Sequence, residues 1–207
     1  MPNSIENGLF QLAKVALSSI TAMFGTVQIA ANGVAQSIWS LAALVGSAMG
    51  PAFITVVGQC MGAGDVDAAD YYMRKLTRLT FFISIAWNAL VLLATPVMLL
   101  FYDLSSEAKN LVLWLVVIHN IFNAAAYPIS GPFSNGLRAA GDVKFTMYIS
   151  LFSTLVVRVA LSVLMGVWLH LGVIGIALAM AGDWCVKAVI LLLRYKGGRW
   201  KAFRVLE

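Results

Sequence analysis

Residues 15–64 read VALSSITAMFGTVQIAANGVAQSIWSLAALVGSAMGPAFITVVGQCMGAG and contain no charged side chain. An α-helix needs about 20 apolar residues to cross the hydrocarbon core of a bilayer, so this stretch is too long for one span and fits two. The pair Asn32-Gly33 is a strong turn signal. It predicts a first helix over about residues 5–30 and a second over about residues 34–61. Pro51 predicts a bend in the second helix.

The composition of the whole chain supports a membrane environment. The chain has 207 residues, is 61% hydrophobic and only 11% charged, and has a mean hydropathy of +0.88. Soluble domains carry about 25% charged residues, so we expect an integral membrane protein whose main partner is the lipid bilayer. The net charge of +5 does not indicate a nucleic-acid partner, because the placement of the cations explains it.

The rest of the chain continues this pattern. Four more apolar segments predict spans over about residues 79–102, 111–137, 145–169 and 173–193. Residues 66–78 mix charges with aromatic and leucine side chains, and they predict an interfacial amphipathic helix. A basic cytoplasmic tail follows from residue 194 to residue 207. The predicted fold class is therefore all-α, with six transmembrane helices in a single membrane domain over residues 1–207.

The loop cations predict the orientation of these spans. Lysine and arginine accumulate on the cytoplasmic side of a membrane protein. With six spans, one side receives only Lys109. The other side receives Arg74, Lys75, Arg78, Arg138, Lys144, Arg194, Lys196, Arg199, Lys201 and Arg204. We therefore predict a multi-pass protein of the cell membrane with both termini in the cytoplasm.

Polar side chains inside the spans suggest a cavity. Asn120, Asn123 and Tyr127 follow helical spacing and share one face of the fourth helix. Polar groups at membrane depth need a protein partner or a water-filled cavity. We predict that these three residues line a substrate cavity together with Gln11 and Gln36. The alternative is ordinary hydrogen bonding between helices, which is worth about 1 kcal/mol or less for each bond.

Charged residues inside the spans require partners as well. Lys14, Arg158, Asp183 and Lys187 all fall within predicted helices. Asp183 and Lys187 are four residues apart and can pair along one face. Arg158 can meet Asp183 across the hairpin of the fifth and sixth helices, a backbone carbonyl or a substrate pathway. We predict that Arg158 and Asp183 form a buried polar pair that supports the cavity. His119 has no acidic residue near it in the sequence, so we assign it no role in proton transfer.

The sequence carries no pattern typical of an enzyme. It has no Ser/His/Asp set with a recognisable spacing, no metal-spaced cluster of histidine and cysteine, and no phosphate-binding Gly-Lys-Ser/Thr loop. We predict no catalytic residues, no metal and no cofactor.

Several ordered motifs resemble those of one known family. The motifs are Pro2–Gln11, Phe24-Gly25 with Ala30–Asn32, Gly58-Gln59 with Gly62–Gly64, and Leu137–Asp142. In these motifs the chain is similar to the multidrug and toxic compound extrusion (MATE) transporters, and the similarity covers essentially all of it. The family has twelve helices in two halves, and this chain resembles the C-terminal half.

The resemblance implies a secondary antiporter. Such a protein exports organic, often cationic, compounds in exchange for Na⁺ or H⁺, through a cavity between the two halves that opens to each side in turn. Some members bind the coupling cation with acidic residues on the first and fourth helices of this half. Here the fourth helix has no acid and Glu6 lies near the start of the first helix, so we assign no ion site.

Three alternatives remain open at this point. The cavity of half a transporter has one wall, so we expect either a second copy, a separate N-terminal half, or a fragment of a longer reading frame, and we favour the fragment. A flippase for a lipid-linked precursor shares this architecture, and several cationic side chains in the cavity would favour it. A non-transporting, truncated membrane fragment is the third alternative.

Overall fold

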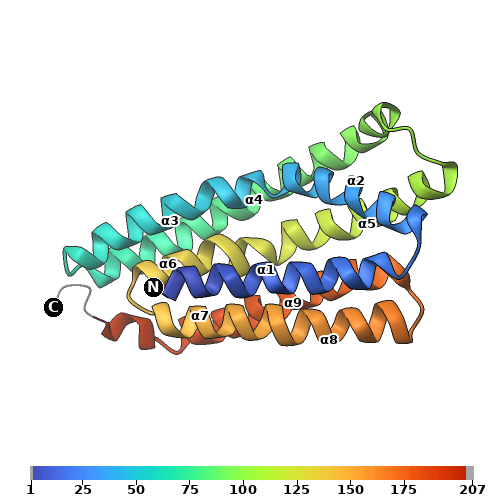
Figure 1. Cartoon of the computed structure of the whole chain (residues 1–207). Helices are drawn as coiled ribbons and strands as arrows, with labels where there is room; N and C mark the ends of the chain where they lie inside the picture. Colours follow the sequence, from blue (N-terminus) through green and yellow to red (C-terminus); the bar gives the residue numbers. More distant parts are fainter. Residues whose placement is uncertain (1, 204–207) are drawn as a thin grey trace.

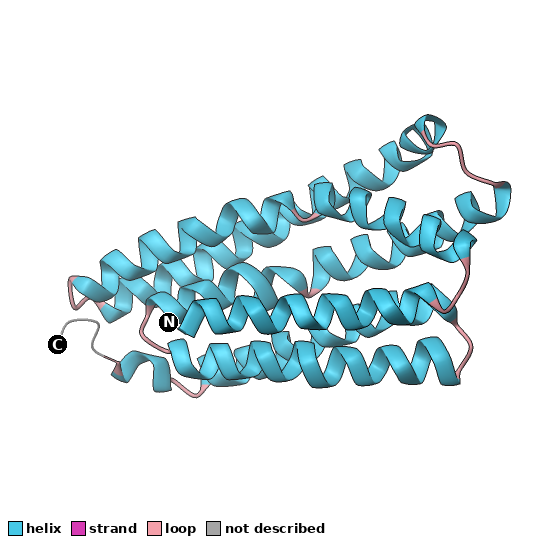
Figure 2. Ribbon diagram, in the orientation of Figure 1, coloured by secondary structure: helices cyan, strands magenta, loops and turns pink. Residues whose placement is uncertain are grey.

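A computed structural model describes residues 2–203, with the side chains of residue 8 and of residues 11–203. The side chain of Glu6 and the end of the predicted tail, including Arg204, lie outside the described residues. The chain forms an elongated bundle of helices that run along a common direction (Figures 1 and 2). Every regular element within residues 2–203 is helical.

The helical elements are α1 Pro2–Ala22, α2 Thr26–Ala42, α3 Leu44–Gly62, α4 Val66–Met98, η1 Leu99–Phe101, α5 Ser106–Ala125, η2 Ile129–Phe133, α6 Ser134–Ala139, α7 Val143–Phe152, η3 Ser153–Arg158, α8 Val159–Ser162, η4 Val163–Trp168, α9 Gly172–Lys196 and η5 Arg199–Ala202. Each pass of the chain along the bundle is made by one helix or by a consecutive pair: α1, α2–α3, α4, α5–α6, α7–α8 and α9 (Figure 1).

The first turn does not lie where the sequence pattern places it. The helix expected to end near residue 30 ends at Ala22, and the connection passes through Gly25, which has a φ of 90°. Only glycine adopts that conformation without strain. Asn32 and Gly33 lie inside α2 instead. A helix keeps backbone groups paired where lipid offers no alternative partner, and this outweighs the local preference of Asn-Gly for a turn.

The second predicted helix is interrupted near its middle. The break between α2 and α3 lies at Ala43, whereas Pro51 lies inside α3. The indole nitrogen of Trp87, on α4, donates a hydrogen bond of 2.8 Å to the carbonyl oxygen of Leu41, next to the break. Contact with α4 therefore provides a partner for a backbone group beside this irregularity.

The predicted interfacial helix over residues 66–78 is the first part of α4 rather than a separate element. The Asp65 side chain caps this helix by accepting a hydrogen bond of 2.8 Å from the backbone of Ala68. The sequence changes from charged to apolar near residue 79, but the helix continues without a break from residue 66 to residue 98. Charged and apolar sections thus share one continuous element of 33 residues.

The later helices contain wide turns. The segment η2, with Pro132, is a π-helical turn between α5 and α6, and η3 and η4 are similar turns on either side of α8. The last hairpin turns at His170 and Gly172, which both have positive φ angles, of 55° and 57°. Wide π-helical turns change the direction of the side chains that follow them. In this protein, η3 places Arg158 beside α9.

The core consists of two main clusters along the bundle. One joins α2, α4, α5 and α9 around Ile38 and Leu115, and the other joins α3, α4, α6 and α9 around Phe53 and Leu137. Between them lies a smaller cluster around Trp184. Because α4 and α9 contribute to both main clusters, these two helices hold the ends of the bundle together.

The outside of the bundle is apolar. Large side chains of α4 and η1 are almost fully exposed, such as Leu93 at 80% and Phe101 at 85%. Five helical segments within the described residues are long and apolar enough to cross a membrane. Figure 1 shows the start of α1, the α3–α4 turn, the α6–α7 turn and η5 at the same end of the bundle. Of the predicted cytoplasmic cations that the structure describes, Arg199 and Lys201 lie in η5, and the others lie in the parts of α4, α6, α7 and α9 that lead to this end.

Candidate functional site

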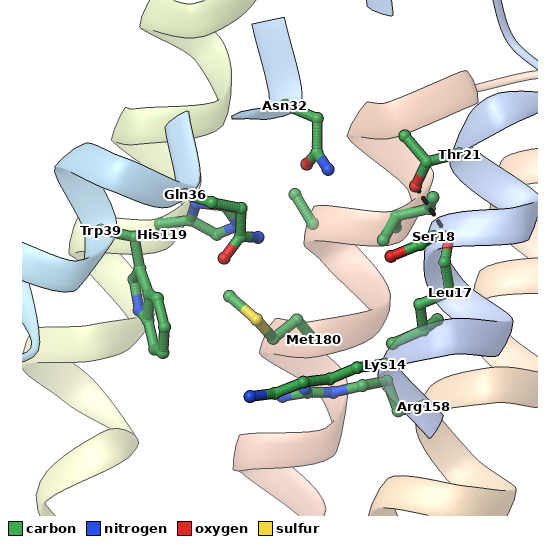
Figure 3. A pocket seen from close by; sticks show the side chains of 12 residues that line it. Lys14, Leu17, Ser18, Thr21, Asn32, Gln36, Trp39, His119, Arg158 and Met180 are labelled. Carbon is green, nitrogen blue, oxygen red and sulfur yellow. Dashed lines mark hydrogen bonds between the residues drawn. The ribbon is translucent and has the colours of Figure 1, made fainter. Parts of the chain in front are cut away.

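A cavity of about 330 Å³ lies inside the bundle. Figure 3 shows side chains of α1 facing side chains of α2 across it. Helix α9, the end of η3 and α5 supply the remaining walls. The lining residues are Lys14, Leu17, Ser18, Thr21, Asn32, Gln36, Trp39, His119, Arg158, Ile176, Ala177 and Met180.

One face of α1 supplies a third of this lining. Lys14, Ser18 and Thr21 are spaced by four and three residues, so they lie on one helical face. Gln11, which we expected in the cavity, lies on the same face one turn nearer the N-terminus, where it is exposed. It is not among the lining residues, because the cavity begins at Lys14.

The facing side of α2 follows the same periodicity. Asn32, Gln36 and Trp39 are spaced by four and three residues and all point to the cavity (Figure 3). Of the five residues predicted for the cavity, Gln36 is the one on this wall. Asn32 lies on this wall as well. The sequence pattern assigns Asn32 to a turn, but in the structure it lies within α2 and faces the cavity.

The polar face of α5 lies deeper in the protein. His119 lines the cavity and is 2% exposed, and both of its ring nitrogens have no hydrogen-bond partner among the described residues. Asn120 and Asn123 are each 1% exposed and are packed inside the bundle rather than on the lining. The side-chain nitrogen of Asn120 donates a hydrogen bond of 2.8 Å to the carbonyl oxygen of Val116.

Tyr127 reaches the cavity only through other aromatic rings. Its ring packs against Trp184, at 5.4 Å between centroids. Trp184 in turn stacks on the lining residue Trp39, at 6.0 Å. A side chain at Gly46 would collide with the Tyr127 ring, since its Cβ would lie 2.3 Å from a ring carbon. Tyr127 therefore fills the contact between α3 and the end of α5.

Beside the cavity, three ionisable residues form a group that we call the ion cluster: Arg158, Asp183 and Lys187. An Asp183 oxygen lies 3.0 Å from Nη2 of Arg158 and 3.5 Å from Nζ of Lys187. The Ser153 hydroxyl donates a hydrogen bond to the other Asp183 oxygen. Lys187 also donates to the Thr154 hydroxyl at 3.4 Å. The structure thus brings together Arg158 and Asp183, and it adds Lys187 to them.

Two kinds of residue in this site escaped the prediction. The sequence marks Lys14 as a charge inside a predicted span but does not assign it to the cavity, and it gives His119 no role because no acid lies near it in the sequence. The spacing of Lys14, Ser18 and Thr21 is a signal that could have found the α1 wall. No local pattern could have found His119, because its position on the lining depends on how α5 packs against α2 and α9.

The described residues offer no group of three or more histidine, cysteine or acidic side chains placed to hold a metal ion. Cys60 and Cys185 are both free thiols. What the arrangement can do chemically is bind a solute: it combines hydroxyls, amides and cations with an aromatic ring in a space between helices.

Comparison with known proteins places this architecture in a family. The MatE family model matches residues 2–164. The chain belongs to the MATE family. The computed structure also superposes on a transporter of the MOP superfamily from Pyrococcus furiosus with a TM-score of 0.86 and 18% identity, over 99% of this chain and 44% of that one. For that transporter, a reversed polarity of the binding pocket was taken to suggest a different function.

Two curated relatives align over almost the whole chain. The transporter YisQ of Bacillus subtilis is 24% identical over 97% of this chain and 44% of its own length. The Thermotoga maritima protein named "Probable multidrug resistance protein NorM" is 22% identical over 99% of this chain and 44% of its own length. The chain therefore spans about half the length of the curated relatives it matches.

Proposed function

We propose that this chain is one lobe of a secondary transporter that moves a small organic solute across a membrane by alternating access. The observation that carries the proposal is a partly open cavity between helices, lined by polar and cationic as well as apolar side chains, in a bundle whose outer surface is apolar. Hydroxyl, amide and cationic groups are costly at membrane depth and are found where they contact substrate, ions or water. A MATE-family lobe would use such a cavity as one wall of the transport site.

In this proposal the chain corresponds to the C-terminal half of a full transporter. Its cavity is completed by a second six-helix unit, which is either an N-terminal half or another copy of this chain. Coupling is antiport with Na⁺ or H⁺. The described residues suggest no coupling site, because the lining lacks an acidic side chain.

Reconstitution tests this function. The chain is placed in proteoliposomes alone, and in parallel with a six-helix half taken from a full-length relative. An imposed Na⁺ or H⁺ gradient should drive solute uptake in at least one preparation, and added solute should release the coupling ion. Solute-independent ion movement, or no movement in either preparation, would contradict the antiport proposal.

Gln36, Asn120, Asn123 and Tyr127 remain part of the proposed site, Gln36 on the wall and the others behind it. Arg158 and Asp183 support the wall through the ion cluster. Gln11 would join the site only if the second half extends the cavity beyond Lys14 towards the start of α1.

One observation favours a second candidate, a flippase for a lipid-linked precursor. Lys14 and Arg158 both line the cavity, and paired cations suit the phosphate groups of such a lipid. Fluorescent lipid-linked pyrophosphate in the same proteoliposomes separates the two functions. Protection of the label from an external quencher, without a need for Na⁺ or H⁺, would favour the flippase.

A further inference from the structure

The charges around the cavity are unbalanced. Lys14 and Arg158 are the charged residues on the lining, and they are both cationic. The side chains of both extend into the space drawn at the lower end of the cavity in Figure 3. No acidic side chain among the described residues lies within ion-pair distance of Lys14. A solute entering here therefore meets positive charge.

The ion cluster does not remove this imbalance. Asp183 is fully buried and is the single carboxylate shared by Arg158 and Lys187. One negative charge cannot compensate for two positive ones, so part of the charge of this cluster faces the cavity through Arg158. The Nε atom of Arg158 is also buried without a hydrogen-bond partner among the described residues. A buried donor of this kind is costly unless a ligand or water accepts its hydrogen bond.

His119 provides an independent observation. Its ring lines the same cavity, is almost completely buried, and has two nitrogens without partners in the described part of the chain. Buried polar groups nearly always have partners, and this one can donate a hydrogen bond to a ligand in the cavity. The two cations, the imidazole of His119 and the Ser18 hydroxyl line the same cavity, and each can donate a hydrogen bond to a solute there.

From this arrangement we propose that the cavity selects an anionic organic solute, whose carboxylate or phosphate group is held between Lys14 and Arg158. The inference rests on the proposed transport function and specifies its substrate class. Charge-assisted hydrogen bonds from lysine and arginine to such groups are short and strong. An organic cation would be repelled by both side chains and would find no acidic partner among the described lining residues. The aromatic ring of Trp39 would contact the apolar part of the solute.

Binding to the purified chain in neutral phosphatidylcholine nanodiscs tests the proposal. The probes are pyrenebutyrate, an organic anion, and pyrenemethylammonium, an organic cation. Energy transfer from tryptophan to pyrene reports binding, and empty nanodiscs correct for partition into lipid. We expect pyrenebutyrate to bind saturably and at least tenfold more tightly than pyrenemethylammonium.

Lys14 is the residue to change, because it takes part in no ion pair with the described part of the chain. Lys14→Gln should weaken pyrenebutyrate binding about tenfold, the usual cost of one charge-assisted hydrogen bond. Lys14→Arg should restore it, and Lys14→Glu should invert the preference between the two probes. Lys109→Gln, which removes a cation outside the cavity, should leave both affinities unchanged.

The outcomes separate this inference from the function on which it rests. Preference for the cationic probe, or unchanged pyrenebutyrate affinity in Lys14→Gln, would overturn the anion proposal and leave a transport lobe. Absence of binding by both probes would also overturn the anion proposal, whereas the transport function is decided separately by the proteoliposome assay. Competition against bound pyrenebutyrate identifies the source of the anion. Displacement by farnesyl pyrophosphate alone indicates a lipid-borne phosphate, and displacement by inorganic pyrophosphate as well indicates a free phosphate. Displacement by neither compound indicates that the site prefers a carboxylate.

Discussion

Single residues matter most where charge is buried. Asp183 has no exposed surface, and its carboxylate forms ion pairs with Arg158 and Lys187 and accepts a hydrogen bond from Ser153. Removal of one partner from a buried ionic group leaves the remaining charges without compensation, and this costs more than the intact group contributes. The ion cluster therefore depends on this one carboxylate. Removal of either cation would leave the other one still paired with Asp183.

We expect Asp183→Ala to lower the free energy of unfolding by about 3–5 kcal/mol, because Arg158 and Lys187 would stay buried without a counter-charge. Thermal unfolding of the purified protein in detergent measures this effect. Asp103→Ala, in an exposed loop position, is the control and should have little effect. Equal unfolding temperatures for the two variants would show that the ion cluster does not stabilise the fold.

A second residue-scale prediction concerns Tyr127, which supports the cavity wall through Trp184 and Trp39. Tyr127→Ala should reduce transport without lowering the amount of protein in the membrane, because Trp184 would lose its packing partner. Uptake of the transported solute in proteoliposomes measures this effect, after correction for incorporated protein. The matched change Tyr148→Ala affects an exposed ring and should leave uptake unchanged. Normal uptake by Tyr127→Ala would separate this ring from the site.

At the scale of elements, close contacts between helices depend on small residues. Helix α9 packs so tightly against η4 that a Cβ at Gly175 would lie 2.5 Å from the backbone nitrogen of Gly166 and 2.5 Å from the carbonyl carbon of Met165. In membranes such close approach of backbones is a main source of helix association, since burial of apolar surface against apolar lipid gains little. The contact keeps α9, with Asp183, beside the segment that carries Arg158.

We expect Gly175→Ala to destabilise the protein by about 1–3 kcal/mol, because backbone atoms cannot move aside as a flexible side chain can. Gly33→Ala is the control at a helical glycine with no atom within 4 Å of the added Cβ. Alanine there should be neutral or stabilising by up to about 1 kcal/mol. The ranking of the two unfolding temperatures decides the question, and a stable Gly175→Ala protein would contradict the close packing.

The end of the described chain is attached to α4 by a second polar group. Asp70 accepts a hydrogen bond from the Tyr195 hydroxyl and pairs with Arg74 at 2.5 Å and with Lys201 at 3.1 Å. Asp70→Asn should raise the rate of amide hydrogen exchange in η5, since local openings are governed by the few contacts that hold a segment. Asp67→Asn, an exposed acid on the same helix, is the control. Unchanged exchange in η5 would assign its attachment to the buried Trp200 alone.

At the scale of the whole molecule, the distribution of cations along the bundle predicts its orientation. The segments that carry most of the loop cations meet at one end (Figure 1), and Lys109 lies near the start of α5 at the other. The cationic end should face the cytoplasm. In a background with Cys60 and Cys185 replaced by alanine, an impermeant maleimide should label Lys109→Cys in intact cells. It should label Lys144→Cys only after permeabilisation, and the reverse pattern would exclude this orientation.

The amino-acid sequence by itself determined the all-helical membrane fold, because every span shows high hydropathy over the length that a bilayer requires. The resemblance to the MATE family came from its ordered motifs instead, such as Leu137–Asp142. Tertiary structure decided where the first turn lies. Helix formation at Asn32-Gly33, which keeps backbone groups paired inside a membrane, outweighs the local preference of these residues for a turn. It also decided which polar residues share the cavity. Periodicity assigns Lys14, Gln36 and Arg158 to faces of their own helices, but only packing brings those faces together, and it leaves Asn120 and Asn123 behind the wall. The charge of the cavity is therefore a property of the folded bundle.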